Sequence, residues 1–206
     1  MHHSKAYNQL LSHVNATGRE KDGYYPNILE EIYDYERDSA EDIIWKAFHD
    51  GDIEVVMYLP KLKKYNGVSA LKKALSHCNI PSYRSIRLAE ALYSCSKHKK
   101  YLDIIISNLR SNSQYDRVAV LHILMTLDPN ERIFEIFEQV CLNDVSDIVR
   151  LTAATGLLYC KGYVKNPFSI QEFQQTLSLH RLLDKDTFEE RQKNINALRD
   201  GKLERC

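Results

Sequence analysis

One short pattern recurs three times along the chain at nearly constant intervals. Each copy is an apolar helical segment with one arginine, and these arginines (Arg87, Arg117 and Arg150) lie 30 and 33 residues apart. A period of this length is typical of repeat architectures in which each unit is a pair of helices. A polar turn precedes each segment and an amphipathic stretch precedes each turn, the turns at 79–83, 111–114 and 143–146 and the stretches near 68–78, 99–110 and 131–142.

Helical periodicity extends over most of the sequence. Apolar residues recur at i, i+3, i+4 and i+7, which predicts helices with one buried stripe. The run 54–59 is rich in strand-forming residues, but it lies inside a longer helical pattern without alternation. Only 7 glycines and 5 prolines are present, few for a fold built on many tight turns. We therefore predict an all-α fold. The longest of these stripes contains Ile133, Ile136, Phe137, Val140 and Cys141.

A fourth, weaker copy precedes the other three. It consists of an expected helix at 40–49, a turn at 49–52, and a second helix at 53–64 that bends near Pro60. The segments on either side, 1–38 and 163–206, are predicted to be helical caps that cover the ends of the array. One structural domain is expected overall.

The segment 147–154, with the sequence Asp-Ile-Val-Arg-Leu-Thr-Ala-Ala, and the Gly-Leu-Leu at 156–158 resemble the second helix of a short HEAT repeat. The resemblance covers about residues 39–162. It implies an α-solenoid of about four helix pairs that bury a continuous core between neighbours. The expected repeats are 39–66, 67–97, 98–128 and 129–162.

The three periodic arginines have two interpretations. In HEAT-like repeats, an arginine at this place commonly ties adjacent repeats through an acid in the preceding turn. Asp147 precedes Arg150 by three residues, and Asp116 directly precedes Arg117. The alternative is that Arg87, Arg117 and Arg150 contact a ligand, and the sequence leaves both interpretations open.

Charge is balanced overall and segregated along the chain. Lys plus Arg and Asp plus Glu number 28 each. Residues 1–54 hold 5 basic and 12 acidic residues, a net charge of −7, whereas residues 55–110 hold 11 basic and 2 acidic residues, a net charge of +9. Such asymmetry bears on partners and on association rates rather than on the fold.

The acidic segment supplies the candidate partner-binding residues. If one helix persists through them, Glu30, Asp34 and Asp38 lie at i, i+4 and i+8 on one face, with Glu31 beside them. Glu41 and Asp42 follow Ser39, a pattern typical of a capping box at a helix start. Tyrosine is enriched at interface hot spots, and the chain has 13 tyrosines. We add Tyr35, Tyr83 and Tyr115 to the predicted contact surface.

No catalytic motif is recognisable in the sequence. HExxH, GxSxG, a P-loop and CxxC are all missing, so we predict neither an enzyme nor a bound metal or cofactor. The five cysteines are expected to be reduced thiols, mostly on apolar helix faces. The longest apolar run is 55–59, against the roughly 20 residues that a membrane span needs, and the first residues resemble no secretory signal. We expect a cytoplasmic protein without membrane contact.

These features favour a non-enzymatic protein-binding module. More loosely, the chain is similar to immunity proteins of bacterial toxin–immunity pairs, which are often small, helical and without catalytic motifs. That resemblance implies one cognate partner, a basic toxin domain (for instance a nuclease) whose active site is occluded in a one-to-one complex; the chain itself would otherwise be a monomer. The alternatives are a HEAT-like nucleic-acid-binding protein or DNA glycosylase that uses the basic block Lys61–Arg110, and a scaffold or regulatory subunit.

Overall fold

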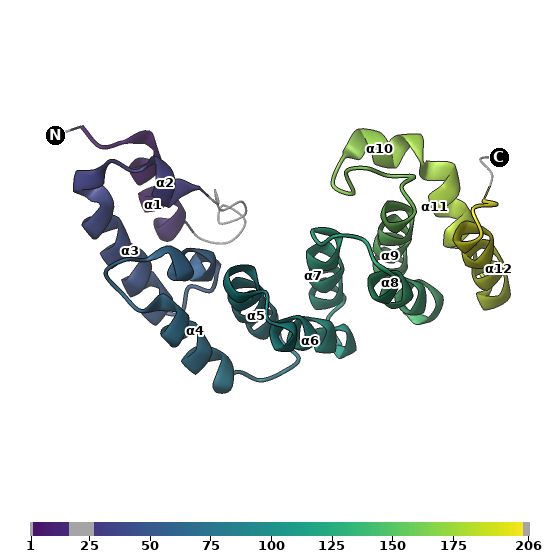
Figure 1. The fold of residues 1–206 in the computed structure, drawn as a ribbon, viewed down its shortest axis with the longest axis horizontal. Coiled ribbons are helices and arrows are strands. Elements are labelled where there is room, and N and C mark those ends of the chain that lie inside the picture. The colour runs from purple at the N-terminus through teal and green to yellow at the C-terminus, as the bar shows by residue number, and fades with distance from the viewer. Residues whose placement is uncertain (1, 17–26, 204–206) are drawn as a thin grey trace. The chain divides into compact units, whose positions relative to one another are not determined.

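The computed structural model describes residues 2–16 and 27–203, and every regular element in these ranges is a helix (Figure 1). The all-α prediction is confirmed for the described chain. Contacts group the chain into two compact units, Met1–Asn108 (unit 1) and Leu109–Cys206 (unit 2). The elements are α1 (Lys5–Asn15), α2 (Ile28–Glu31), η2 (Asp34–Glu36), α3 (Arg37–His49), η3 (Glu54–Lys61), α4 (Gly67–Ser76), α5 (Tyr83–Ser96), α6 (Lys99–Ser107), η4 (Asn108–Arg110), α7 (Gln114–Met125), α8 (Glu131–Asn143), α9 (Asp147–Cys160), α10 (Ile170–Gln175), α11 (Leu177–Leu183) and α12 (Phe188–Arg199).

The predicted polar turns contain the residues that cap the following helices. The Oγ atoms of Ser82 and Ser113 accept the backbone N–H groups three residues ahead, at the starts of α5 and α7. These bonds satisfy donors that the first helical turn leaves unpaired. α9 differs, because the hydroxyl of Ser146 donates instead to Oε1 of Gln114 in α7, at 2.7 Å. The start of α9 is thereby tied to the start of α7.

Unit 1 is organised around η3, which lies against α3, α4 and α5. Gly67 begins α4 where the chain passes close to η3, since a Cβ atom at Gly67 would lie 2.0 Å from the carbonyl oxygen of Leu59. At the end of α6, the buried side chain of Asn108 accepts the N–H of Ser82 and the hydroxyl of Ser85. This amide fixes the end of α6 against the start of α5.

The weakest predicted repeat needs a correction. The expected α-helix over 53–64 is the 3₁₀-helix η3, eight residues long, which contains Pro60. Proline has no N–H to donate and its ring clashes with the carbonyl group four residues earlier, which disfavours α-helical geometry here. A 3₁₀-helix of this length is uncommon. Four of its residues are buried, including Val55 and Leu59, so tertiary packing rather than local preference stabilises it.

α9 is the central helix of unit 2. It packs against α7, α8 and α11, and α8 packs in turn against α12. Residues 153–158 of α9 are all buried, which agrees with their apolar sequence. Gly156 allows α8 to approach closely, because a Cβ atom there would lie 2.5 Å from the ring of Phe137.

Arg117 and Arg150 make equivalent contacts in unit 2. Each is the fourth residue of its helix, and each donates through Nη1 to a backbone carbonyl six residues earlier. Nε and Nη2 of Arg117 donate to both carboxylate oxygens of Asp144, at 2.7 and 2.9 Å. Nε of Arg150 donates to Asp184 at 2.8 Å, and its Nη2 donates to Asp147 at 2.5 Å. Both guanidinium groups therefore join successive helix pairs.

The expected acidic partner of Arg117 was wrong. Asp116 accepts the hydroxyl of Ser111, and the partner of Arg117 is Asp144, which follows α8. Arg87 in unit 1 has a different arrangement, with Glu90 in its own helix and Glu54 of η3. Packing contacts thus occupy all three periodic arginines.

A further arginine, missed in the sequence, makes part of the same set of contacts, although its buried Nε has no hydrogen-bond partner in the described chain. Arg191 is the fourth residue of α12, and its Nη1 donates to the carbonyl oxygen of Lys185, again six residues earlier, at 2.6 Å. Its Nη2 donates to the carbonyl oxygen of Leu142 at the end of α8. The segment predicted as a cap therefore contains a helix placed like α7 and α9. Its polar sequence carries little of the apolar pattern that identifies those two helices.

The cysteine prediction holds only in part. Cys78, Cys95, Cys141 and Cys160 are free thiols, and Cys206 lies outside the described residues. Cys141 is buried, and burial raises the pKa of its thiol to about 12. Cys95, expected on an apolar helix face, is exposed at the end of α5.

We expect Arg117→Leu to lower the free energy of unfolding by about 3 kcal/mol, because it leaves the nearly buried carboxylate of Asp144 without its partner. Urea denaturation followed by circular dichroism measures the change. Arg181→Leu removes an exposed arginine from the same unit and serves as the control, with an expected effect under 0.5 kcal/mol. Equal stability of the two variants would contradict a structural role for Arg117.

A buried histidine joins α11 to α9. His180 is fully buried, with Nδ1 2.9 Å from the carbonyl oxygen of Thr176 and Nε2 3.0 Å from Oγ1 of Thr155. Burial lowers the pKa of this imidazole from its ordinary value of 6.5. His180 is consequently neutral in the folded protein at pH values where the unfolded chain already binds the proton.

Stability should therefore fall as the pH decreases below about 6.5, because the unfolded state gains a proton that folded His180 resists. Denaturation curves at pH 7.5 and pH 5.5 measure this difference. The carboxylates with lowered pKa titrate below this window. We expect His180→Gln to reduce the pH dependence, whereas His77→Gln, at an exposed position, should leave it as in the wild type. A pH dependence unaltered by His180→Gln would refute this assignment.

Candidate protein-binding site

The predicted acidic residues lie on an exposed edge of unit 1. Glu30, Glu31, Asp34, Tyr35 and Asp38, here called the acidic edge, are all exposed. The single helix expected to carry them does not exist, because α2 ends at Glu31 and residues 32 and 33 are extended before η2 and α3 follow. The i, i+4, i+8 spacing therefore does not describe their arrangement. Proximity within one short segment brings them together instead.

The break between α2 and α3 is explained by the one acid of this segment that is buried. Oε1 of Glu36 accepts the N–H of Ser4 and lies 2.9 Å from Nδ1 of His3, and Oε2 accepts the N–H of Tyr33. Although burial opposes it, these hydrogen bonds hold the pKa of Glu36 below its usual value. The chain turns inward to place this carboxylate, and the neighbouring acids remain outside.

A hollow of about 460 Å³ adjoins the acidic edge. Glu30 and Asp34 contribute to its lining together with Lys61 and Lys63, so the site has mixed charge. Nζ of Lys61 donates to Glu30 at 2.9 Å, which partly compensates that acid. Asp34 and Asp38 have no ion pair within the described residues. They are the acids of the edge whose charge is left for a partner.

Behind this edge, a second buried carboxylate fixes the loop that follows η3. Glu41 accepts Nε of Arg37 and the backbone N–H groups of Lys63 and Lys64, all between 2.7 and 3.0 Å. Burial opposes ionisation, yet these bonds lower the pKa of Glu41 below its usual value. The predicted capping role of Glu41 is wrong, because α3 begins at Arg37, before Ser39.

Glu41→Gln should destabilise unit 1 by about 2–4 kcal/mol, since it removes the charge that Arg37 and the two backbone amides surround. Thermal and urea unfolding measure the loss. Asp42→Asn provides the control: it removes an exposed pair with Lys64, for which less than about 1 kcal/mol is expected. Similar losses in the two variants would show that the buried bonds of Glu41 contribute little.

The structure does not gather the three predicted tyrosines into one surface. The hydroxyl of Tyr35 donates to the carbonyl oxygen of His2 at the acidic edge. The hydroxyl of Tyr83 donates to Glu54, and burial together with this acid raises its pKa to about 12. Glu54 and Lys61 are at opposite ends of η3, roughly 14 Å apart at 2.0 Å per residue. Tyr83 is thus distant from the hollow, and Tyr115 belongs to unit 2.

Part of the basic block Lys61–Arg110 is paired with acids of unit 1. Lys61 pairs with Glu30, Lys64 with Asp42, and Arg87 with Glu54 and Glu90. The exposed lysines 97, 99 and 100 have no ion pair in the described chain, and two of them lie over tyrosine rings. Lys97, Lys99 and Lys100 therefore place three unpaired positive charges at the turn between α5 and α6.

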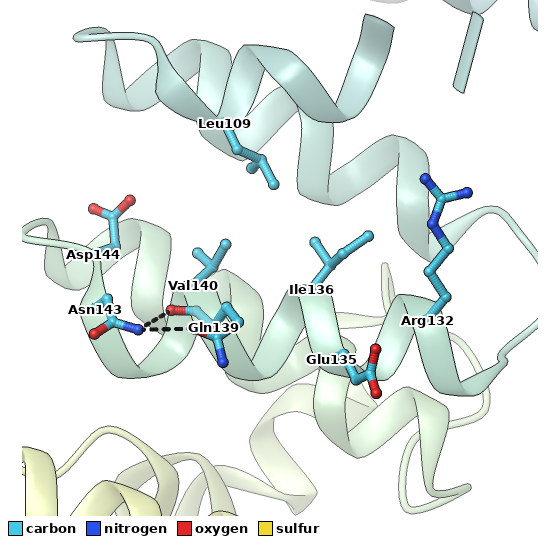
Figure 2. Close-up of a pocket in the computed structure, with 8 residues that line it drawn as sticks. All are labelled: Leu109, Arg132, Glu135, Ile136, Gln139, Val140, Asn143 and Asp144. Atoms are coloured by element: carbon cyan, nitrogen blue, oxygen red, sulfur yellow. Dashed lines mark hydrogen bonds between the residues drawn. The ribbon is translucent and has the colours of Figure 1, made fainter. Parts of the chain in front are cut away.

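An apolar groove in unit 2 was not expected from the sequence. Ile136 and Val140, assigned to a buried stripe, are only partly buried, whereas Phe137 and Cys141 on the same helix are fully buried. Figure 2 shows Ile136 and Val140 pointing from α8 toward Leu109. The sequence has no signal that separates Ile136 and Val140 from Phe137 and Cys141, because all four belong to one apolar stripe. The groove, of about 590 Å³, is lined by Leu109, Arg132, Glu135, Ile136, Gln139, Val140, Asn143 and Asp144.

Within residues 2–16 and 27–203, no group of three or more metal-ligating side chains is placed to hold a metal ion. Among the described helices there is likewise none with the length and apolar character that crossing a membrane requires. Comparison with protein-family models, with curated proteins and with solved structures finds no match for this chain. The argument for function consequently depends on the surfaces described above.

Proposed function

We propose that this chain is a non-enzymatic protein-binding module made of HEAT-like helix pairs, and that its acidic edge binds one basic protein. The observation that carries the proposal is the exposure of Asp34 and Asp38 without an ion pair, beside exposed Tyr35. The buried acids Glu36, in this segment, and Glu41, further along α3, are instead occupied by structural hydrogen bonds. Some acids of this region therefore stabilise the fold through buried hydrogen bonds, whereas others are exposed to solvent.

The more specific proposal is an immunity protein that blocks a toxin. A basic toxin, for instance a nuclease, carries positive charge where its anionic substrate binds, and an acidic edge complements such a surface. The module would then occlude the active site and would need no catalytic group of its own. Complementary charge also steers the encounter, so association is fast at low ionic strength.

Charge reversal of the acidic edge tests this proposal. We expect the variant Glu30→Lys, Asp34→Lys, Asp38→Lys to associate at least tenfold more slowly with the basic partner that co-purifies from the native cell. The expected cause is loss of electrostatic steering, so the effect should diminish at high salt. Surface plasmon resonance at two salt concentrations measures the association rate.

A matched triple variant controls for net charge. Asp50→Lys, Asp186→Lys, Glu189→Lys changes the total charge equally at exposed positions outside the edge. Circular dichroism confirms that both variants fold. If both variants slow association equally, or neither does, the edge is not the binding site.

A second candidate function is nucleic-acid binding through the turn between α5 and α6. The observation in its favour is the unpaired charge of Lys97, Lys99 and Lys100. Three lysines release few counterions, so this surface alone would give weak and strongly salt-dependent binding. The protein-binding proposal accounts for more of the exposed surface.

A further inference from the structure

Two neighbouring helices of unit 2 have no polar face. After Arg117, the only polar residue of α7 (Gln114–Met125) is His122, and after Arg150 the polar side chains of α9 are Thr152, Thr155 and Tyr159, whose hydroxyl donates to the carbonyl oxygen of Leu127. A helix that is apolar all round is normally buried all round. In unit 2, however, one face of α7 and part of α9 remain accessible to solvent. The amino-acid composition of that surface is therefore typical of a protein interface rather than of a solvent-exposed surface.

The accessible side chains of α7 form one stripe. Tyr115, Val118, Ala119 and His122 lie at i, i+3, i+4 and i+7, and all are exposed or partly exposed. Tyr115 is 76% exposed. At the far end of the stripe, the ring of Phe168 packs edge-on against His122, with centroids 5.8 Å apart, and is itself 53% exposed. Burial lowers the pKa of His122, so this stripe carries no positive charge at neutral pH.

The exposed apolar surface continues from the start of α7 to the start of α9. Ile148 is the second residue of α9, as Tyr115 is of α7, and the bond from Ser146 to Gln114 holds the two helix starts together. Ile148 is 56% exposed and Val145, just before α9, is 90% exposed. Between them the surface is hollowed by about 530 Å³. Large apolar side chains exposed singly are ordinary, but a cluster of this kind marks an interaction surface.

The most exposed charged side chain on α7 and α9 is the carboxylate of Asp147, which also accepts Nη2 of Arg150. The only charged residues on α7 and α9 are Asp116, Arg117, Asp147 and Arg150. The side chains of Arg117 and Arg150 are only 10% and 15% exposed and are held in ion pairs, whereas the side chain of Asp147 is 84% exposed. A segment that covers the stripe therefore meets apolar side chains and one projecting carboxylate.

We propose that the outward face of α7 and α9 is the docking surface for an amphipathic helical segment of a partner protein, whose apolar side chains cover Tyr115 and Ile148 and whose lysine or arginine side chains lie beside Asp147. Two helices that pack side by side each bury one apolar stripe, so the stripe on α7 fits the apolar face of an amphipathic helix. The inference rests on the proposed protein-binding function and adds a second surface to it, separate from the acidic edge.

The probes for the test are two fluorescein-labelled 18-residue helical peptides. Both have leucine at the same positions, and their remaining positions are lysine in one and glutamate in the other. Fluorescence anisotropy with the full chain should give a Kd at least tenfold lower for the lysine peptide. Tyr115→Ser with Ile148→Ser should raise the Kd of the lysine peptide at least tenfold. Asp147→Lys, which keeps the apolar stripe, should abolish the preference for lysine.

Ile80→Ser with Phe188→Ser is the matched control, because both residues are exposed and apolar but lie outside this face. It should change the Kd less than twofold. Thermal unfolding shows whether each variant folds. If the double serine variant does not fold, the effect of Asp147→Lys on the preference for lysine still decides the test. Equal affinity for the two peptides, or equal losses in the two double variants, would overturn the proposal.

Two further outcomes separate this inference from its rivals. Sedimentation velocity showing a dimer of the wild type that Tyr115→Ser with Ile148→Ser dissociates would mean that a second copy covers the face, contrary to the proposal. With the natural partner, loss of binding in that variant but not after charge reversal at the acidic edge would support this surface and refute the edge. The opposite pattern would support the edge and refute this surface.

Discussion

Burial of a guanidinium group sets the strictest requirement in unit 2. A charge removed from water is tolerated when charged or polar partners surround it, and the planar guanidinium group restricts where those partners lie. Arg117 meets this requirement only if α7 and the end of α8 adopt one relative position, since Asp144 must meet both Nε and Nη2. Arg150 imposes the same condition between α9 and the end of α11. The apolar packing of α9 supplies most of the buried surface, but it would permit neighbouring registers that these ion pairs exclude.

The helices were predictable because their sequence signals are local. The predictions that were wrong concerned contacts between residues distant in the sequence. Periodicity and capping serines lie within a few residues of the structure they specify, so α5, α7, α8 and α9 could be placed from the sequence. The partner of Arg117 is 27 residues distant, and nothing local distinguishes Asp144 from Asp116. The continuous acidic helix failed because Glu36 must reach Ser4 and Tyr33. The exposure of the acids at the edge does not result from helical periodicity, and periodicity could not show which side of α8 is left uncovered.

Charge counts along the sequence overestimate the uncompensated charge at the protein surface. The acidic segment 1–54 and the basic segment 55–110 belong to one compact unit, where several of their charges pair with each other. The groups without an ion pair in the described chain include Asp34 and Asp38 at the acidic edge and Lys97, Lys99 and Lys100 at the turn between α5 and α6. Opposite charges distant in sequence can thus serve the fold, and only those without a counterpart are available for recognition.

Asp144 contributes to two arginines at once. Its carboxylate accepts hydrogen bonds from the guanidinium group of Arg117, and its backbone carbonyl oxygen accepts Nη1 of Arg150 at 3.1 Å. The two arginines therefore share a residue, and the effects of replacing them should not be additive. The same sharing fixes the length of the connection between α8 and α9. Inserting or deleting one residue there would misplace both contacts together, so that short connection should keep its length in descendants of this chain even where their sequences diverge.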